Sequence, residues 1–427
     1  MSATRQLCAS CGRDSPDTDP HTRCAQCGGL LAIDYAPPVL GGPALRAVFD
    51  ARLGVRRGPL ASGVWRFTEV VLPDAGEHVL SYPEGNTPLL ASVAVAAWAG
   101  VDGLLLKHEG HNPTGSFKDR GMTVGVTQAR RLSVRAVACA STGNTGASLA
   151  AYAALAGLPA LVLVPRGQVA LGKLAQLLAY GARTLVVRGT FDQCLELADE
   201  ASERLGVYLL NSVNPFRLEG QKTIVLELLQ QLGWQPPAWI VVPAGNLGNT
   251  AAFGKALEEA CQWRLIRRLP RLAAIQAAGA APFALSFRDG FARRHQVEPH
   301  TVATAINIGN PASYERAVRA IQRTNGVVTT VTDDELLEAK AVVDGAGIGC
   351  EPASAAAVAG VRRLGREGVI GRGERVVAVL TGHLLKDPAS VTQYHQEREP
   401  PPPHANRPVE IDARLAEVER MMSPRRR

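Results

Sequence analysis

The segment that decides the fold is Lys107–Gly121, which reads KHEGHNPTGSFKDRG. It follows a short apolar run, turns through Asn-Pro-Thr-Gly and then opens a helix. Backbone N–H groups and the helix dipole favour anions at a helix start, and a positive charge is unfavourable there. Lys118 stands at this position. We therefore expect its amine to work as a neutral nucleophile that forms a Schiff base.

Two other junctions between a strand and a helix follow along the chain. Ala140–Ser148, ASTGNTGAS, offers small residues, hydroxyls and free N–H groups that suit an anion such as a carboxylate. Val242–Thr250, VPAGNLGNT, is a Gly-rich loop of the kind that lets the backbone wrap a phosphate. Each junction alone could be an ordinary turn. Together with the lysine, they predict a ligand that carries a phosphate and an aldehyde.

Around these junctions, short apolar runs alternate with helical stretches rich in alanine and leucine. This alternation indicates βαβ units on buried parallel sheets. The apolar stretch Ala147–Pro165 is interrupted by Gly157 and Pro159, so it predicts a helix, a turn and a strand instead of a membrane span. Strands are expected at Gly103–Lys107, Ala136–Ala140, Ala160–Val164, Thr184–Val187, Trp239–Val242, Leu272–Gln276, Val327–Val331 and Val376–Leu380, and helices at Ala147–Ala156, Lys173–Tyr180, Phe191–Leu205 and Lys222–Gln231.

Four of the eight cysteines form two CxxC pairs near the start of the chain. Twelve residues separate the pair Cys8 and Cys11 from the pair Cys24 and Cys27. Two such knuckles can place four thiolates around one zinc ion, which would also supply the fold that a small polar segment lacks. Four thiolates leave no open position, so we expect a structural zinc. Unrelated cysteines and a redox pair are the alternatives, and no strand-to-helix context supports the redox pair.

Composition and charge indicate a globular chain without a nucleic-acid or membrane partner. The 427 residues suggest two or three domains at roughly 150 residues each, and 46% hydrophobic residues exclude a disordered or collagen-like chain. The net charge is +7. Apart from the cluster Arg425–Arg427 at the end, the basic residues are scattered, and they lack the interleaved aromatics of a nucleic-acid surface. Met1–Gln6 contains no apolar signal region, so we expect a cytoplasmic protein with reduced thiols.

The motifs of the three junctions resemble those of the threonine synthase family, pyridoxal-phosphate (PLP) enzymes of fold type II. Further matches are EPASAA at Glu351–Ala356 and TGHLLKDP at Thr381–Pro388, and all motifs stand in the family's order between Gly85 and Pro388. Some family members carry a similar four-cysteine segment. The resemblance implies an α/β, two-lobed fold like the tryptophan synthase β chain, with parallel-rich sheets and an N-terminal zinc-ribbon-like segment. Glu351 begins a helix, where an acid suits the dipole, and is given no chemical role.

The resemblance also implies a division into domains. A zinc-binding segment would occupy residues 1–35, and a small domain residues 103–208. The large PLP-binding domain would combine residues 36–102 with 209–395. Residues 396–427 would form a Pro-rich linker and a basic tail, with a short charged helix at Val409–Met421.

Cofactor contacts are carried over residue by residue. The resemblance implies that Lys118 holds PLP as a Schiff base and shuttles protons. Asn144 would hydrogen-bond the cofactor's 3′-oxygen, and Thr381 would lie beside its pyridine nitrogen, where a neutral hydroxyl tunes the electron sink. The cofactor phosphate would rest on the backbone of Gly245, Asn246, Leu247, Gly248 and Asn249.

Substrate contacts follow from the same comparison of motifs. Ser141, Thr142 and Thr145 would hold the amino-acid carboxylate. The segment Asn211–Lys222 resembles the family's substrate-phosphate site, with Asn211, Ser212 and Arg217 as contacts, and an arginine suits a dianion because its fork donates two hydrogen bonds.

The implied activity is that of a homodimeric lyase that converts O-phospho-L-homoserine and water into L-threonine and phosphate by γ-elimination and β-addition. Four positions depart from the family pattern, namely His111, Gly146, Asn307 and Leu384. They leave open a related enzyme that replaces the phosphate of a phosphorylated amino acid with another nucleophile, as cysteate synthase does. A non-catalytic binding protein on the same fold is the third interpretation, and the intact Lys118 argues against it.

Overall fold

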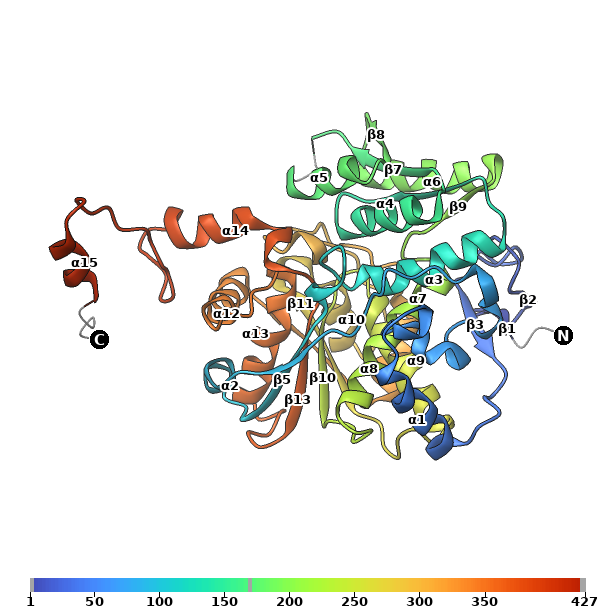
Figure 1. Ribbon diagram of the computed structural model, residues 1–427, viewed down its shortest axis with the longest axis horizontal. Helices are drawn as coiled ribbons and strands as arrows, with labels where there is room; N and C mark the ends of the chain where they lie inside the picture. The colour runs from blue at the N-terminus through green and yellow to red at the C-terminus, as the bar shows by residue number, and fades with distance from the viewer. Residues whose placement is uncertain (1–3, 168–170, 423–427) are drawn as a thin grey trace.

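The computed structural model describes residues 4–167 and 171–422, so the basic end Arg425–Arg427 lies outside the described residues. The described chain contains three sheets (Figure 1). The largest has six strands in the order β12-β11-β10-β13-β5-β4. All neighbours pair in parallel except β4 and β5. Its strands are β4 (Leu89–Ala91), β5 (Gly103–His108), β10 (Trp239–Pro243), β11 (Arg271–Ala277), β12 (Val327–Val331) and β13 (Arg375–Leu380).

This sheet is buried on both faces, which explains its nearly continuous apolar strands. In β10, Trp239 and Val241 join one hydrophobic core, while Ile240 and Val242 join the other. Helices α2, α12 and α13 supply the first core, and α1, α8, α9 and α11 supply the second. These helices are α1 (Gly42–Ala51), α2 (Val93–Ala99), α8 (Thr223–Gln231), α9 (Gly248–Gln262), α11 (Tyr314–Arg323), α12 (Asp333–Gly345) and α13 (Pro352–Arg366), with the short α10 at Pro282–Arg288.

A second, four-stranded parallel sheet forms the smaller lobe, at the top of Figure 1. Its order is β8-β7-β6-β9. Helices α4 and α5 pack on one face, and α6 packs on the other. The elements are β6 (Ala136–Ala140), α4 (Asn144–Ala156), β7 (Ala160–Pro165), α5 (Leu171–Ala179), β8 (Arg183–Val187), α6 (Phe191–Leu205) and β9 (Val207–Leu209).

The start of the expected small domain belongs to the larger sheet instead. Strand β5 pairs with β13 over six residues, and both of its neighbours lie in the six-stranded sheet. The strands of the smaller sheet begin only at Ala136. The division at residue 103 therefore requires correction, because the apolar run at Gly103–His108 is covered on both faces by the larger lobe.

The N-terminal segment forms a small antiparallel sheet of its own, at the right of Figure 1. It consists of β1 (Thr4–Cys8), β2 (Asp14–Pro16) and β3 (Leu31–Tyr35), in the order β2-β1-β3. Asp17 pairs with Arg131 at a distance of 2.8 Å, and Arg316 of α11 donates to the Leu31 carbonyl. The segment is therefore attached to the helices of the body by polar contacts.

Two helices at the centre approach each other closely through glycines. Helix α3 (Lys118–Arg131) packs against α7 (Pro215–Gln221). A Cβ atom added to Gly220 would lie 1.8 Å from the Arg120 carbonyl oxygen, and one added to Gly125 would lie 3.3 Å from Arg217 Cγ. The glycines bring the start of α3 next to the side chain of Arg217.

A buried ion cluster fixes the start of α3 through Arg120. Glu227 of α8 accepts from Lys107 of β5 at 2.6 Å and from Arg120 of α3 at 2.8 Å. Arg120 also pairs with Glu109 at 2.7 Å. Since removal of one partner would leave an uncompensated buried charge, the cluster fixes three elements relative to one another.

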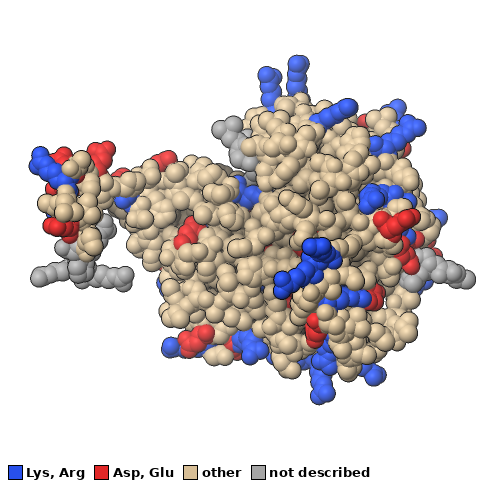
Figure 2. Space-filling model, viewed as in Figure 1, with Lys and Arg blue, Asp and Glu red and all other residues tan. Residues whose placement is uncertain are grey.

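The C-terminal residues leave the body of the protein. Helix α14 (Pro388–Thr392) is followed by a π-helical turn at Gln393–Glu397, and the last helix, α15 (Leu415–Met422), lies far to the left in Figure 1. The expected helix at Val409–Met421 thus begins later, at Leu415, because a bend at Ala413 precedes it. Within the described residues, no helix is long and apolar enough to cross a membrane. On the face shown in Figure 2, basic side chains are scattered among acidic ones over both lobes.

Candidate active site

Lys118 is the first residue of α3, and its segment is tied to the loop that follows β13. The Phe117 N–H donates to the Thr381 carbonyl at 3.0 Å, and the His383 N–H donates to the Gly115 carbonyl at 2.9 Å. Two motifs separated by more than 250 residues therefore lie side by side, and they contain Lys118 and Thr381.

The Lys118 side chain is half-buried and its amine is easily deprotonated. Burial lowers the pKa of this amine to about 7, and the Arg217 guanidinium lowers it further, while Glu351 acts in the opposite direction. The Nζ atom lies 4.1 Å from the centre of the Phe117 ring. A large neutral fraction of the amine is thus present near neutral pH, as a nucleophile for an aldehyde requires.

Arg217 presents a buried positive charge with unused hydrogen-bond donors. Its Nη1 donates to the Leu210 carbonyl at 3.1 Å, whereas Nε and Nη2 have no partner among the described residues. Burial lowers its pKa to about 10, so the guanidinium stays charged at neutral pH. A buried cation with free N–H groups is costly unless an anion binds it. The structure thus provides an anion site next to Lys118.

The other two residues expected at the substrate phosphate have different surroundings. The Asn211 amide accepts from the Ala140 N–H and donates to the Ala140 carbonyl, both at 2.9 Å. This pairing joins the ends of β6 and β9 and already uses both amide atoms. The Ser212 hydroxyl accepts from Asn246 Nδ2 at 3.1 Å. Ser212 therefore connects the expected substrate site with the Gly-rich loop.

The turn before α4 contains the residues expected at the substrate carboxylate. The Ser141 hydroxyl accepts from the Gly143 and Gly146 N–H groups, each at 3.1 Å, and so shapes the turn. Thr142 is half-buried and Thr145 is buried. A Cβ atom at Gly146 would lie 3.1 Å from a Leu177 methyl carbon, so the glycine departure from the family pattern matches the close packing of α5.

The Gly-rich loop between β10 and α9 is formed as a cradle. A Cβ atom at Gly245 would lie 2.8 Å from Ile306 Cα, and Leu247 adopts a left-handed conformation with φ 63° just before α9 begins at Gly248. Asn246 Oδ1 accepts from the Ala312 N–H at 2.7 Å, which fixes the loop. Asn249 Oδ1 and the Thr250 hydroxyl are buried without a partner among the described residues. Sequence reasoning left Thr250 out, although it directly follows the GNLGN motif.

Glu351 is the second residue whose place in the site was missed. Its carboxylate accepts from Asn144 Nδ2 at 2.9 Å and from the Thr381 hydroxyl at 3.4 Å. The Thr381 hydroxyl also lies 3.0 Å from Ser354 Oγ. Asn144 and Thr381, expected on two edges of one cofactor ring, thus meet through this carboxylate. Because Glu351 is the first residue of the EPASAA motif, the sequence resemblance could have indicated its place in the site.

The residues present fit PLP. A half-buried amine of lowered pKa suits its aldehyde, and a glycine cradle at the start of the 15-residue helix α9 suits its phosphate. The Thr250 hydroxyl beside this cradle is a buried donor without a partner in the described part of the chain, as a phosphate ligand requires. These groups come from both lobes, Asn144 from the smaller one and the Gly-rich loop from the larger one.

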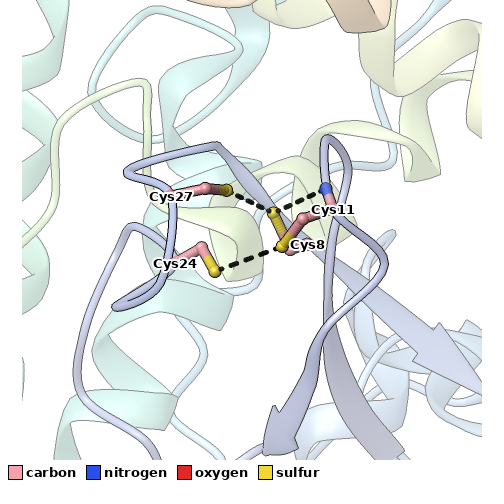
Figure 3. Close-up of side chains that lie close together, drawn as sticks. All are labelled: Cys8, Cys11, Cys24 and Cys27. Carbon is pink, nitrogen blue, oxygen red and sulfur yellow. Dashed lines mark hydrogen bonds between the residues drawn. The ribbon is translucent and has the colours of Figure 1, made fainter.

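The four N-terminal cysteines also lie together, pointing toward one another from two knuckles (Figure 3). All four Sγ atoms lie within 4.8 Å of one another, with Cys8 and Cys27 3.5 Å apart and Cys11 and Cys24 3.7 Å apart. A tetrahedral zinc site with Zn–S bonds of about 2.3 Å has sulfur–sulfur edges of roughly 3.8 Å. The expected ligands Cys8, Cys11, Cys24 and Cys27 therefore have the spacing of such a site.

Comparisons with known proteins extend these observations. The profile of the family described as pyridoxal-phosphate dependent enzymes matches residues 80–382. The chain is 44% identical over 397 residues to the threonine synthase of Methanocaldococcus jannaschii, covering 92% of this chain and 95% of that protein. It is 45% identical over 394 residues to the threonine synthase of Methanosarcina acetivorans, covering 91% of this chain and 94% of that protein.

A solved structure agrees with this result at the level of the fold. The threonine synthase of Escherichia coli superposes with a TM-score of 0.70 at 18% identity, covering 98% of this chain and 99% of that one. The two-lobed α/β fold of type II and the resemblance stated from the motifs are thereby confirmed. Given this coverage, the chain is a PLP-dependent enzyme and belongs to the threonine synthase family.

Proposed function

We propose that the chain converts O-phospho-L-homoserine and water into L-threonine and phosphate. The observation that carries the proposal is the proximity of Lys118 to Arg217, whose positive charge acts on the lysine amine. A lysine amine with a pKa of about 7 stands beside a buried guanidinium whose Nε and Nη2 are unpaired. The phosphate of a phosphorylated amino acid would supply a negative charge to this guanidinium. Its α-proton would then face the Lys118 amine, which acts as the base.

Each group of residues has a separate task in this proposal. Bound PLP, held by Lys118, Asn144, Thr381 and the Gly245–Asn249 loop, supplies the electron sink. The Lys118 amine removes and returns protons on the substrate carbons. Arg217 and Ser212 hold the leaving phosphate, and the turn from Ser141 to Thr145 orients the carboxylate. The chain thus contributes placement and charge, while the electronic chemistry comes from the cofactor.

A cysteate synthase-like enzyme remains the second candidate, and packing weakens the case for it. Gly146 accommodates Leu177, and Leu384 lies against Gly349, where an added Cβ would lie 3.2 Å from it. These two departures from the family pattern therefore have local structural reasons. Nothing in the structure explains Asn307 in place of the arginine that is frequent in the family.

A product assay separates the candidates. Purified enzyme loaded with PLP is incubated with O-phospho-L-homoserine, and both released phosphate and the amino-acid product are measured, with Lys118→Ala as the control. We expect equal amounts of phosphate and threonine, and neither from the variant. Phosphate release without threonine would contradict the proposal and point to another nucleophile.

We further propose one structural zinc on the four cysteines, a homodimer and a location in a reducing compartment such as the cytoplasm. The sulfur spacing supports the zinc, and a four-thiolate site needs reduced cysteines. We also keep the division into a zinc segment, a large domain, a small domain and a tail, with the small domain beginning after β5.

A further inference from the structure

Glu351 is a buried carboxylate without a salt-bridge partner in the described residues. The residue is 2% exposed and is the N-cap of helix α13. Other buried glutamates, such as Glu227 and Glu259, pair with lysines at 2.6 and 2.7 Å. A buried carboxylate whose bonding partners are neutral is costly to keep, so its position calls for a role beyond the ion clusters.

The backbone around Glu351 is shaped to admit the carboxylate. The Glu351 N–H donates to the Gly382 carbonyl at 3.0 Å. A Cβ atom at Gly382 would lie 2.5 Å from the Glu351 carboxyl carbon, so only a glycine leaves room for it. The loop that follows β13 thus holds the carboxylate between Asn144 and Thr381.

We propose that Glu351 is a positioning residue of the cofactor pocket, which sets the orientation of the Asn144 amide and keeps a negative charge beside Lys118. This inference rests on the proposed roles of Lys118 and Asn144 in holding PLP. It adds to them a residue that touches neither the phosphate loop nor the anion site at Arg217.

The first half of the role follows from hydrogen-bond chemistry. A carboxylate only accepts hydrogen bonds, so Asn144 must turn its NH₂ group toward Glu351. That nitrogen carries a second hydrogen, which is left for the cofactor's 3′-oxygen, also an acceptor. Without the carboxylate, the amide could rotate by half a turn and present its oxygen, which would repel the cofactor's oxygen.

The second half follows from charge. A negative group near an amine or a protonated Schiff base stabilises the protonated form. Glu351 acts in this direction on Lys118, against both burial and Arg217. The carboxylate therefore keeps the nitrogen of Lys118 from losing its proton too readily.

The test compares Glu351→Gln with wild type and with Glu259→Gln, a matched buried glutamate in the ion cluster with Lys222 and Lys255. PLP is added to cofactor-free protein. The absorbance of the Schiff base then gives both the dissociation constant and the midpoint pH at which the Schiff base loses its proton. Thermal unfolding shows whether each variant is folded. Glu351→Gln keeps the size and an acceptor but removes the charge.

We expect the midpoint pH of Glu351→Gln to fall by about one unit, since one neighbouring charge is lost. Its affinity for PLP is expected to fall roughly tenfold, because the Gln amide can also donate and so releases Asn144 from its fixed orientation. Glu259→Gln should match wild type in both measurements. A midpoint that differs from wild type by less than about 0.2 pH units, which is roughly what such a titration resolves, would overturn the inference.

Failure of the underlying assignment gives a different result. If wild type itself forms no Schiff base, or if Lys118→Ala still forms one, the role of Lys118 is wrong and the inference falls with it. If wild type forms the Schiff base and Lys118→Ala does not, the role of Lys118 stands. The effect of Glu351→Gln then tests the role of Glu351 by itself. Glu351→Ala, which also removes the acceptor, should bind PLP more weakly than Glu351→Gln, and equal or tighter binding would contradict the amide orientation.

Discussion

At the scale of single residues, the proton of Lys118 decides when the site is reactive. Its ammonium is disfavoured by burial, so the pKa lies near 7 instead of its ordinary value of 10.5. Below that pH the amine is protonated and cannot attack an aldehyde. Above it the neutral form dominates.

We therefore predict that Schiff base formation with added PLP accelerates as pH rises through about 7 and then levels off. Stopped-flow absorbance at a series of pH values measures this rate in cofactor-free protein. A rate that keeps rising toward pH 10 would mean that the amine is not shifted. The reference is a short peptide with one exposed lysine, whose rate of Schiff base formation should keep rising toward pH 10 because its amine is not buried.

Arg217 should control substrate affinity more than turnover. Its two unpaired nitrogens, Nε and Nη2, are expected to donate charge-assisted hydrogen bonds to the substrate phosphate. Arg217→Lys keeps the charge but loses the fork, so KM for O-phospho-L-homoserine should rise roughly 10- to 100-fold, equivalent to about 1.5–3 kcal/mol.

Steady-state kinetics with wild type and Arg217→Lys provide the measurement. PLP absorbance of the variant serves as the control, because the cofactor should still load. An unchanged KM would show that the phosphate binds elsewhere.

Some residues of the site could be predicted from the sequence, and others could not. Lys118 and the Gly245–Asn249 loop lie in contiguous motifs at helix starts, where local geometry alone indicates an anion or a nucleophile. Glu351 is the N-cap residue just before α13, where the helix dipole already accounts for an acid. Only the fold brings its carboxylate to Asn144, 207 residues earlier in the chain.

At the scale of secondary structure elements, the contact of α3 with α7 tolerates no added atom at Gly220. A Cβ there would lie 1.8 Å from the Arg120 carbonyl, which belongs to a backbone fixed by the ion cluster. We predict that Gly220→Ala destabilises the protein by 3 kcal/mol or more, at or above the usual range of about 1–3 kcal/mol for overpacking.

The matched control for that substitution is Gly345→Ala at the end of α12. An added Cβ there meets no atom within 4 Å, so the substitution should be neutral or stabilising by up to about 1 kcal/mol. Chemical denaturation of both variants gives the comparison. Equal unfolding midpoints would contradict the proposed close contact.

The zinc segment offers a prediction about metal content. We expect one zinc ion per chain by atomic absorption, and nearly none in Cys24→Ser, because a four-thiolate site loses its geometry with one ligand. Cys261→Ser changes a half-buried cysteine outside the cluster and should retain the metal. A zinc-free wild type, or full zinc in Cys24→Ser, would refute the site.

The elements themselves were predictable to different degrees. The long strands of the parallel sheets are apolar because both faces are buried, and β6 and β12 begin and end where the sequence predicts. The three-residue strands β4 and β9 carry too little pattern to be recognised. Assigning β5 to the larger sheet required knowledge of its partner β13, which no local pattern contains.

At the scale of the whole molecule, the last residues should be dispensable for stability. The ion pairs of Arg414 with Asp412 and of Arg420 with Glu417 are local. Leu415 and Met422 are exposed. We predict that removal of residues 409–427 changes the thermal midpoint by about 1 °C or less.

A longer truncation gives the contrast. Ending the chain at Thr392 removes Tyr394, which is 4% exposed and belongs to the core beside α12 and α13. This variant should unfold several degrees lower, by differential scanning calorimetry. If the short truncation lowered the midpoint equally, the tail would have a stabilising contact that the described structure does not contain.

The attachment of the N-terminal sheet has a consequence for folding during synthesis on the ribosome. The carbonyl groups of Leu31 and Ala9 accept from Arg316 and Arg319, which follow them by 285 and 310 residues. These two contacts can therefore form only after most of the chain has been synthesised, whereas the pair of Asp17 with Arg131 can form earlier. During that interval the zinc ion proposed on the four cysteines would help to order the segment, so we expect a shortage of zinc to increase its need for chaperones before any finished enzyme is lost.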